Sequence, residues 1–287
     1  MPEKTLLVIA GPTAVGKTAY CIELAKKLQT DVVSADSRQF YRELTIGTAK
    51  PTPEEMQGVT HHFIDSHNIT ETYTAGQYER DCLNLLDELF RKKDTVILTG
   101  GSGLFLKVVT DGMDEMPDPD PELRWELRRR LETEGLPALL EDLQRLDPVF
   151  YEKIDRQNPV RVLRALEVCL TTGQPYSSLR TGAKAERPFV SQKICLTRPR
   201  EELYARIDAR MDAMLAAGLV DEARTLLPYR HHNALQTVGY QEVFGFLDGA
   251  YDFDEMVRLL KRNSRRYAKR QMTWFRNRGE YEFRTMI

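Results

Sequence analysis

Residues 11–18 read Gly11-Pro12-Thr13-Ala14-Val15-Gly16-Lys17-Thr18, which is a complete phosphate-binding loop. The two glycines allow the tight turn in which backbone N–H groups converge on an anion. Lys17 supplies a mobile positive charge, and the hydroxyl of Thr18 is the expected ligand of a magnesium ion. The apolar run 6–10 predicts a buried parallel strand before the loop, and residues 20–28 predict an amphipathic helix after it. This stretch therefore predicts a binding site for a di- or triphosphate.

Two more buried strands are predicted in the first third of the chain, and each ends in a polar or glycine-rich segment. Residues 31–35 run into Asp36-Ser37-Arg38-Gln39, and residues 95–98 end at Gly100-Gly101-Ser102-Gly103. A helical pattern at 75–90 separates them. Strands that alternate with helices form a parallel sheet with helices on both faces, and ligands bind at the carboxyl ends of the strands. We therefore expect an α/β fold of the P-loop NTPase type, with its site built from these strand ends.

The composition changes at Met116-Pro117-Asp118-Pro119-Asp120-Pro121, which predicts a boundary. Helical patterns follow at 122–134, 137–146 and 159–170, then a flexible loop at 177–187 and a returning strand at 192–196. We expect a catalytic core made of residues 1–115 and 190–287. An all-helical insertion over residues 116–189 interrupts it.

The composition is that of an ordinary globular protein, with no stretch long enough to cross a bilayer. The chain has 287 residues, a net charge of −2 and four cysteines without metal-ligand spacing, so buried thiols in a reducing cytoplasm are expected. The first strand starts too early to leave room for a signal peptide.

Residues 258–278 contain nine basic residues and no acidic one. With aromatic residues interleaved, this segment suits a nucleic-acid backbone and its stacked bases, or else is a solvated basic helix.

Asp36 is the second informative residue, because it directly follows a predicted parallel strand beside the phosphate loop. A carboxylate in this place can hold magnesium through water or act as a general base. A turn or capping role is the structural alternative, and position alone does not separate the three. The neighbouring His61 and His62 do not indicate a metal site, since adjacent residues of a strand point to opposite faces.

Several longer blocks carry a resemblance to a known family. The first are Ser34 to Tyr41 and Ile46 to Pro51, followed by His61 to Asp65 and Gly100 to Leu106. The later blocks are Asn158 to Glu167, Thr237 to Glu242 and Arg270 to Phe275. In this order, and over nearly the whole chain, they resemble the bacterial tRNA dimethylallyltransferases, which are also called tRNA isopentenyltransferases.

The resemblance implies transfer of a dimethylallyl group from dimethylallyl diphosphate to N6 of adenine 37, in tRNAs that read codons beginning with U. The loop Gly11 to Thr18 then holds the diphosphate of the donor, with Mg²⁺ near Thr18. The implied catalytic residues are Asp36 as general base, Ser102 and Lys17. The resemblance also implies that the helical insertion grips the anticodon stem-loop of the tRNA. The implied tRNA contacts are made by the following residues: Asp36, Ser37, Arg38, Gln39, Ser102, Arg124, Val160, Arg161, Val162, Leu163 and Arg164. A cytoplasmic monomer is expected.

Two positions depart from the family pattern. Ser102 stands where many members have threonine, which keeps the hydroxyl. Gln236 stands where some members have an arginine implicated with the diphosphate, so another cation must serve that purpose here.

Three other functions are weighed against the transferase. A small-molecule kinase of the phosphate-loop class predicts ATP turnover. An isopentenyltransferase acting on free adenine nucleotides needs neither the helical insertion nor the basic C-terminal helix. A non-catalytic RNA-binding protein leaves Asp36 and Ser102 without a role.

Overall fold

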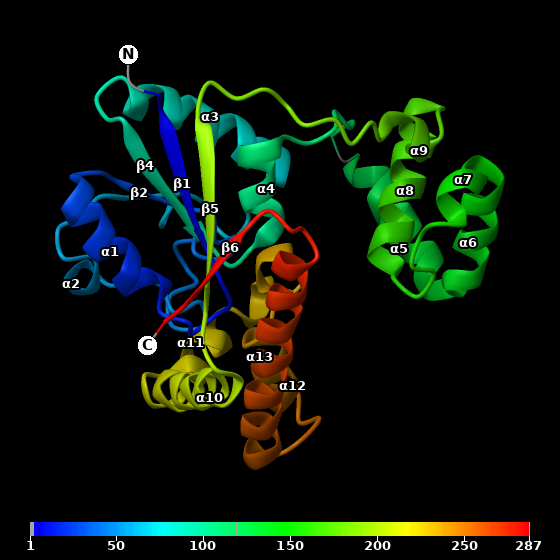
Figure 1. Ribbon diagram of the computed structural model, residues 1–287. Helices are drawn as coiled ribbons and strands as arrows, with labels where there is room; N and C mark the ends of the chain where they lie inside the picture. Colours follow the sequence, from blue (N-terminus) through cyan, green and yellow to red (C-terminus); the bar gives the residue numbers. More distant parts are fainter. Residues whose placement is uncertain (1–2, 119, 287) are drawn as a thin grey trace. The chain divides into compact units, whose positions relative to one another are not determined.

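The computed structural model describes residues 3–118 and 120–286, so Pro119 of the predicted boundary lies outside the described residues. Within that part of the chain, six parallel strands form one sheet in the order β3-β2-β4-β1-β5-β6 (Figure 1). The strands are β1 (Thr5–Ala10), β2 (Val32–Ser34), β3 (His61–His62), β4 (Thr95–Gly100), β5 (Val190–Thr197) and β6 (Glu282–Thr285). The predicted α/β fold is confirmed, and its four predicted strands are β1, β2, β4 and β5. Strand β6 carries no apolar pattern because all its residues are exposed, and the sequence does not predict it.

The pairing register brings the carboxyl ends of the central strands to one level. Ala10 of β1 pairs with Gly100 of β4 and with Cys195 of β5, while Ser34 of β2 pairs with Thr99 of β4. The segments that follow β1, β2 and β4 therefore leave the sheet along the same edge. This edge carries the phosphate loop, Asp36 and the glycine-rich turn.

Helices cover both faces of the sheet, as the alternating side chains of β1 require. Leu6 and Val8 point into one core, to which α3 (Ala75–Phe90) and α4 (Gly103–Asp111) contribute. Leu7 and Ile9 point into a second core, to which α1 (Lys17–Leu28) and α10 (Arg200–Ala216) contribute. Figure 1 shows α1 on one side of the strands, with α3 and α4 on the other.

The C-terminal part of the chain is helical before β6. It contains α10, α11 (Leu219–Thr225), α12 (Tyr240–Leu247) and α13 (Phe253–Arg276), with 3₁₀ turns at Leu227–Tyr229 and Asn233–Leu235. The short α2 (Pro53–Met56) lies between β2 and β3 in the chain. The basic segment falls mostly on α13, which confirms that it is helical. Among the described residues no helix is both long and apolar enough to span a membrane.

The glycine-rich turn after β4 allows α13 to approach the sheet edge closely. A Cβ atom added at Gly103 would lie 2.4 Å from the ring of Trp274, and one added at Gly101 would lie 2.3 Å from Nε2 of Gln271. Both partners belong to α13. The family-like block Arg270 to Phe275 therefore meets the block Gly100 to Leu106 in space.

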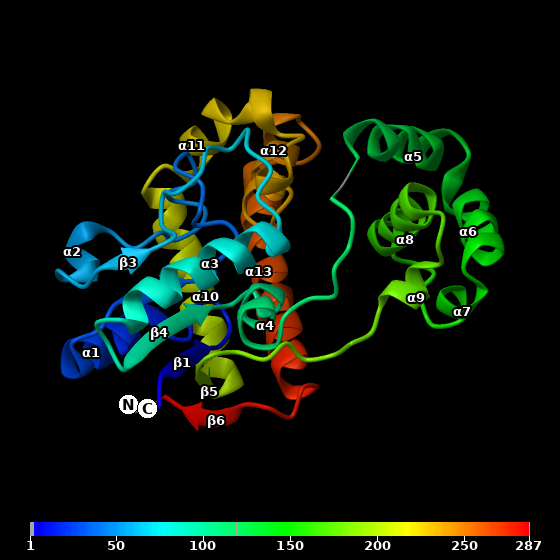
Figure 2. The ribbon, with the colours of Figure 1, turned by 90° about the horizontal axis from the view of Figure 1, so that it is seen from above.

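Residues Gly112–Ala185 form a separate compact unit, whereas residues up to Asp111 and from Glu186 onward form the α/β unit. The helical unit contains α5 (Pro121–Thr133), α6 (Gly135–Leu146), α7 (Pro148–Tyr151), α8 (Pro159–Thr172) and α9 (Tyr176–Leu179), which are drawn in green in Figure 2. Leu127, Leu139 and Val162 belong to its own apolar core. The three predicted long helices are present as α5, α6 and α8, and α9 occupies the start of the predicted loop 177–187.

Candidate active site

The phosphate loop has the backbone geometry that its glycines predict. Gly11 has φ +151° and a virtual Cβ 2.9 Å from the carbonyl oxygen of Leu196, and Gly16 has φ +110°. Helix α1 begins directly after Gly16 and has no side-chain cap, so its first amide groups are available to an anion. Nζ of Lys17 donates to the carbonyl oxygens of Gly11 at 3.0 Å and Pro12 at 2.9 Å. Burial lowers the pKa of Lys17 to about 8, although the Asp36 carboxylate partly opposes that shift.

Three arginines that follow the end of β5 surround this loop. Nε of Arg198 donates to the carbonyl oxygen of Val15 at 2.9 Å. From α10, Nε of Arg206 donates to Ala14 O at 2.9 Å, and Nη1 of Arg210 donates to Thr13 Oγ1 at 3.1 Å. The sequence reasoning missed all three residues. The signal was the i, i+4 spacing of Arg206 and Arg210, which places both side chains on one face of a helix.

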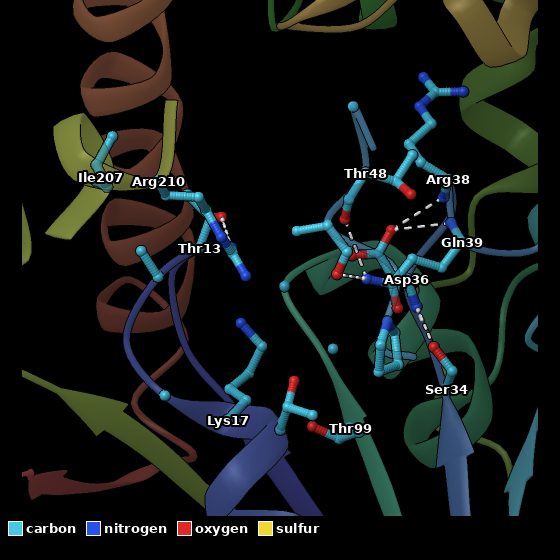
Figure 3. A pocket seen from close by; sticks show the side chains of 18 of the residues that line it. Thr13, Lys17, Ser34, Asp36, Arg38, Gln39, Thr48, Thr99, Ile207 and Arg210 are labelled. Carbon is cyan, nitrogen blue, oxygen red and sulfur yellow. Dashed lines mark hydrogen bonds between the residues drawn. The ribbon is translucent and has the colours of Figure 1, made fainter. Parts of the chain in front are cut away.

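A cavity of about 730 Å³ opens at this edge of the sheet. The predicted site residues Thr13, Ala14, Gly16, Lys17, Thr18, Asp36, Arg38 and Gln39 line it, together with Arg206, Arg210 and Tyr267. Figure 3 shows Lys17 and Arg210 converging on one side, with Asp36, Gln39 and Thr48 on the other. Cations thus line the wall beside the phosphate loop, and the opposite wall presents oxygen acceptors together with the guanidinium group of Arg38.

Asp36 makes the turn contacts of the structural alternative, and its side chain also lines the cavity. Its Oδ1 accepts hydrogen bonds from the backbone N–H of Arg38 at 2.9 Å and of Gln39 at 3.4 Å, which shape the turn after β2. Its Oδ2 accepts no hydrogen bond from the described residues, while the side chain lines the cavity. One carboxylate oxygen is therefore available to a ligand.

Ser102 and Ser37 lie beside Asp36 and contact each other. Their Oγ atoms are 3.2 Å apart, and the backbone N–H of Ser37 points at Oγ of Ser102 at 3.4 Å. Tyr267 of α13 lies near Ser102, and burial, with a contribution from Asp36, raises the pKa of Tyr267 to about 12. The sequence reasoning treated Tyr267 only as an aromatic residue of a basic helix. The structure adds its hydroxyl to the acceptor wall.

Gln236 does not line this cavity. Its Nε2 donates to the carbonyl oxygen of Arg230 at 2.8 Å, and its Oε1 accepts from Gln241 at 2.9 Å. Arg206 and Arg210 are the cations that meet the phosphate loop instead. The described residues contain no cluster of histidine, cysteine and acidic side chains suited to a metal.

The remaining predicted residues lie in the helical unit. Arg124 and Arg164 both donate to Oε2 of Glu167, at 2.9 and 2.7 Å, and Glu167 is only 2% exposed. This shared carboxylate holds the two guanidinium groups together. Arg161 and Val160 are exposed and Leu163 is partly buried, whereas Val162 is fully buried and has no accessible surface for a contact with tRNA.

Two groups of basic residues can be distinguished on α13. Salt bridges neutralise Arg258, Lys261 and Arg265 with Glu255, Asp212 and Asp208. Arg266 and Lys269 are exposed and have no salt bridge to any described residue. Of these two groups, the second is the one free for a polyanion.

Comparison with known proteins places these features in context. A family model described as IPP transferase matches residues 39–278. The tRNA dimethylallyltransferase of Cytophaga hutchinsonii is 57% identical over 98% of this chain and 92% of its own length. The tRNA dimethylallyltransferase 2 of Porphyromonas gingivalis is 51% identical over 96% of this chain and 91% of its own.

Two solved structures are similar over almost the whole chain. The tRNA isopentenylpyrophosphate transferase of Bacillus halodurans has a TM-score of 0.71 and 38% identity, covering 99% of this chain and 90% of that one. A eukaryotic dimethylallyltransferase acting on tRNA has a TM-score of 0.82 and 26% identity, covering 98% of this chain and 74% of that one.

The arginine wall predicts a measurable affinity for inorganic diphosphate. Arg210→Gln should weaken diphosphate binding at least tenfold in isothermal titration, since charge-assisted hydrogen bonds contribute about 1.5–3 kcal/mol. The matched control is Arg200→Gln, because Arg200 lies on the same helix but is exposed and stacks on Tyr204. Equal affinities of the two variants would show that Arg210 does not meet the phosphate groups.

Proposed function

We propose that this chain, which belongs to the IPP transferase family, transfers a dimethylallyl group from dimethylallyl diphosphate to N6 of adenine 37 in tRNA. The tRNAs are those that read codons beginning with U, and the products are N6-dimethylallyladenosine and diphosphate. One observation carries the proposal. The phosphate loop, with Arg206 and Arg210 bound to it, faces the same cavity as Asp36, whose Oδ2 is free to accept a hydrogen bond.

On the donor side, the diphosphate is held by the loop amides, Lys17, Arg206 and Arg210. The bond between C1 of the allyl group and the diphosphate oxygen breaks, and the negative charge on the leaving group increases. Donors placed in advance around that charge stabilise the transition state more than the ground state. Burial lowers the pKa of Lys17 because it removes water from the ammonium group, so an anion beside that group interacts with it strongly.

Magnesium fits the same wall. The hydroxyl of Thr18 lines the cavity and makes no hydrogen bond to the described residues, so it is free to be a ligand. When bound, the ion would add further positive charge beside the leaving diphosphate.

On the acceptor side, adenine N6 is a poor nucleophile because its lone pair is delocalised into the ring. As N6 forms its bond to C1, one N6 proton passes to Oδ2 of Asp36. General-base assistance of this kind contributes about 10²–10⁴-fold. Ser102, whose Oγ lies 3.2 Å from Oγ of Ser37, offers a hydroxyl next to that carboxylate. The target base must leave its stack, which costs little in a single-stranded loop.

The contacts with tRNA come from both units. Asp36, Arg38 and Gln39 line the cavity where the target base reacts, and Ser37 and Ser102 contact each other next to Asp36. The helical unit presents Arg124, Arg161 and Arg164, and we assign it to the anticodon stem-loop, as part of an insertion over residues 116–189 in a core of 1–115 and 190–287. The protein acts as a monomer in the cytoplasm.

The direct test is incubation with labelled dimethylallyl diphosphate, Mg²⁺ and unmodified tRNA, with AMP and ATP as parallel acceptors. Label should enter tRNA only, and ATP should not be consumed. Asp36→Asn should lower turnover by about 10²–10⁴-fold while tRNA binding persists. Asp87→Asn is the control, since Asp87 is an exposed residue of α3 paired with Arg91.

Three results would contradict the proposal. Label in AMP to the same extent as in tRNA would indicate an enzyme for free nucleotides. Phosphoryl transfer from ATP would indicate a kinase. Equal turnover of the Asp36 and Asp87 variants would remove Asp36 as the base.

The two groups of basic residues on α13 predict different salt dependences of tRNA binding. Replacing Arg266 and Lys269 by glutamine should reduce the slope of log affinity against log salt by about 0.7–0.9 for each phosphate that the protein no longer neutralises. Replacing Arg265 and Lys261, which are already paired with Asp208 and Asp212, should change the slope less. A filter-binding series across salt concentrations that gives the same slope for both variants would exclude α13 from the RNA interface.

A further inference from the structure

Glu222 of α11 binds a loop to which the sequence assigns no task. One carboxylate oxygen, Oε2, accepts the backbone N–H of Thr45 at 3.1 Å and of Ile46 at 2.8 Å. The other, Oε1, accepts the backbone N–H of Gly47 at 2.9 Å and the hydroxyl of Tyr240 at 2.6 Å. Three consecutive amide groups and a phenol therefore converge on one side chain. The carboxylate satisfies donors that the turn itself leaves unpaired.

The loop cannot retreat from this anchor without losing its fit. A Cβ atom at Gly47 would lie 2.5 Å from Cζ of Tyr240, so the backbone passes directly over the phenol ring. Tyr240 is fully buried and has no room to move. The blocks Ile46 to Pro51 and Thr237 to Glu242 thus meet at Glu222. Residues of both blocks also line the cavity.

The far side of the same loop holds Gln39. Nε2 of Gln39 donates to the carbonyl oxygens of Thr48 at 3.1 Å and Ala49 at 3.2 Å. Because both partners are acceptors, the amide orientation is set, and Oε1 of Gln39 is left as an acceptor in a residue that lines the cavity. The backbone N–H of Gln39 in turn binds Oδ1 of Asp36. A continuous set of contacts therefore connects Glu222 with the acceptor wall.

We propose that Glu222 is a positioning residue for the nucleobase side of the cavity. It holds residues 45–49 so that Oε1 of Gln39 and the Asp36 carboxylate present acceptors to an exocyclic amine, which has two N–H donors. A carbonyl at the same place on the base would face these two oxygen atoms, which cannot donate to it. The donor wall is braced separately, by Arg206, Arg210 and Gln271. Glu222 therefore affects the use of tRNA and not the use of the allylic diphosphate.

The test compares Glu222→Gln with Asp221→Asn. Both changes turn a carboxylate of α11 into an amide, but the Asp221 side chain is 79% exposed and, among the described residues, pairs with Arg224 alone. In Glu222→Gln the new NH₂ group faces N–H donors, so kcat/KM for tRNA should fall at least tenfold while KM for dimethylallyl diphosphate stays within twofold. Asp221→Asn should leave both parameters unchanged. Tyr240→Phe, which removes one of the four hydrogen bonds, should lower kcat/KM for tRNA by an intermediate factor.

Hydrogen–deuterium exchange supplies a readout that needs no substrate. Exchange of the amides of residues 45–47 should increase in Glu222→Gln and remain unchanged in Asp221→Asn. Unchanged exchange in Glu222→Gln overturns the anchor itself, whichever reaction the protein catalyses.

The kinetic part rests on the proposed function, and wild-type transfer to tRNA is its reference. If the wild-type protein does not transfer the dimethylallyl group to tRNA, the proposed function is wrong. The hydrogen–deuterium exchange experiment still tests whether Glu222 anchors residues 45–47. If the wild-type protein is active, two results overturn the positioning role. One is that Glu222→Gln impairs the use of tRNA and of dimethylallyl diphosphate to the same extent, and the other is that it impairs neither. If Glu222→Gln does not fold, the test passes to Tyr240→Phe. A kcat/KM for tRNA in that variant equal to that of the wild-type protein overturns the positioning role.

Discussion

One buried carboxamide sets the spacing on which the site depends. Oε1 of Gln271 accepts the backbone N–H of Thr13 at 3.0 Å, from a residue 258 positions earlier in the chain, and its Nε2 donates to the carbonyl oxygen of Gly101 at 3.0 Å. A single side chain of α13 therefore ties the phosphate loop after β1 to the turn after β4. The bridge needs a residue without Cβ at position 101. Because an unpaired buried amide is costly, the geometry is strongly favoured once formed.

This bridge separates two walls of opposite character. On one side, Lys17 and Arg210 lie at the loop, both are partly buried, and desolvation lowers their pKa values. On the other side, Asp36 and Gln39 present oxygen atoms supported by their own turn and by the loop at residues 45–49. A cavity of this kind suits a reaction that releases an anion at one end and a proton at the other.

The sequence predicts the parts of the site that lie within a few residues of a strand. The phosphate loop and Asp36 could be predicted because a glycine pattern and a strand end are local signals. Arg206 and Arg210 could have been found, since the buried residues Leu203, Ile207, Met211 and Met214 of α10 recur at helical spacing. Tyr267 and Glu222 could not, because their partners lie on distant segments that only the folded chain brings together. Strand β6 could not be predicted for a different reason. It is an exposed edge strand and therefore carries no apolar pattern.

The most direct measurement is a crystal structure of the protein with an unreactive thio analogue of dimethylallyl diphosphate and an anticodon stem-loop. The account predicts diphosphate oxygens within about 3 Å of the loop amides and Arg210. It also predicts adenine N6 within hydrogen-bond distance of Oδ2 of Asp36. A diphosphate held in the loop while the adenine lies elsewhere, with Asp36 bonded only to its own turn, would contradict it.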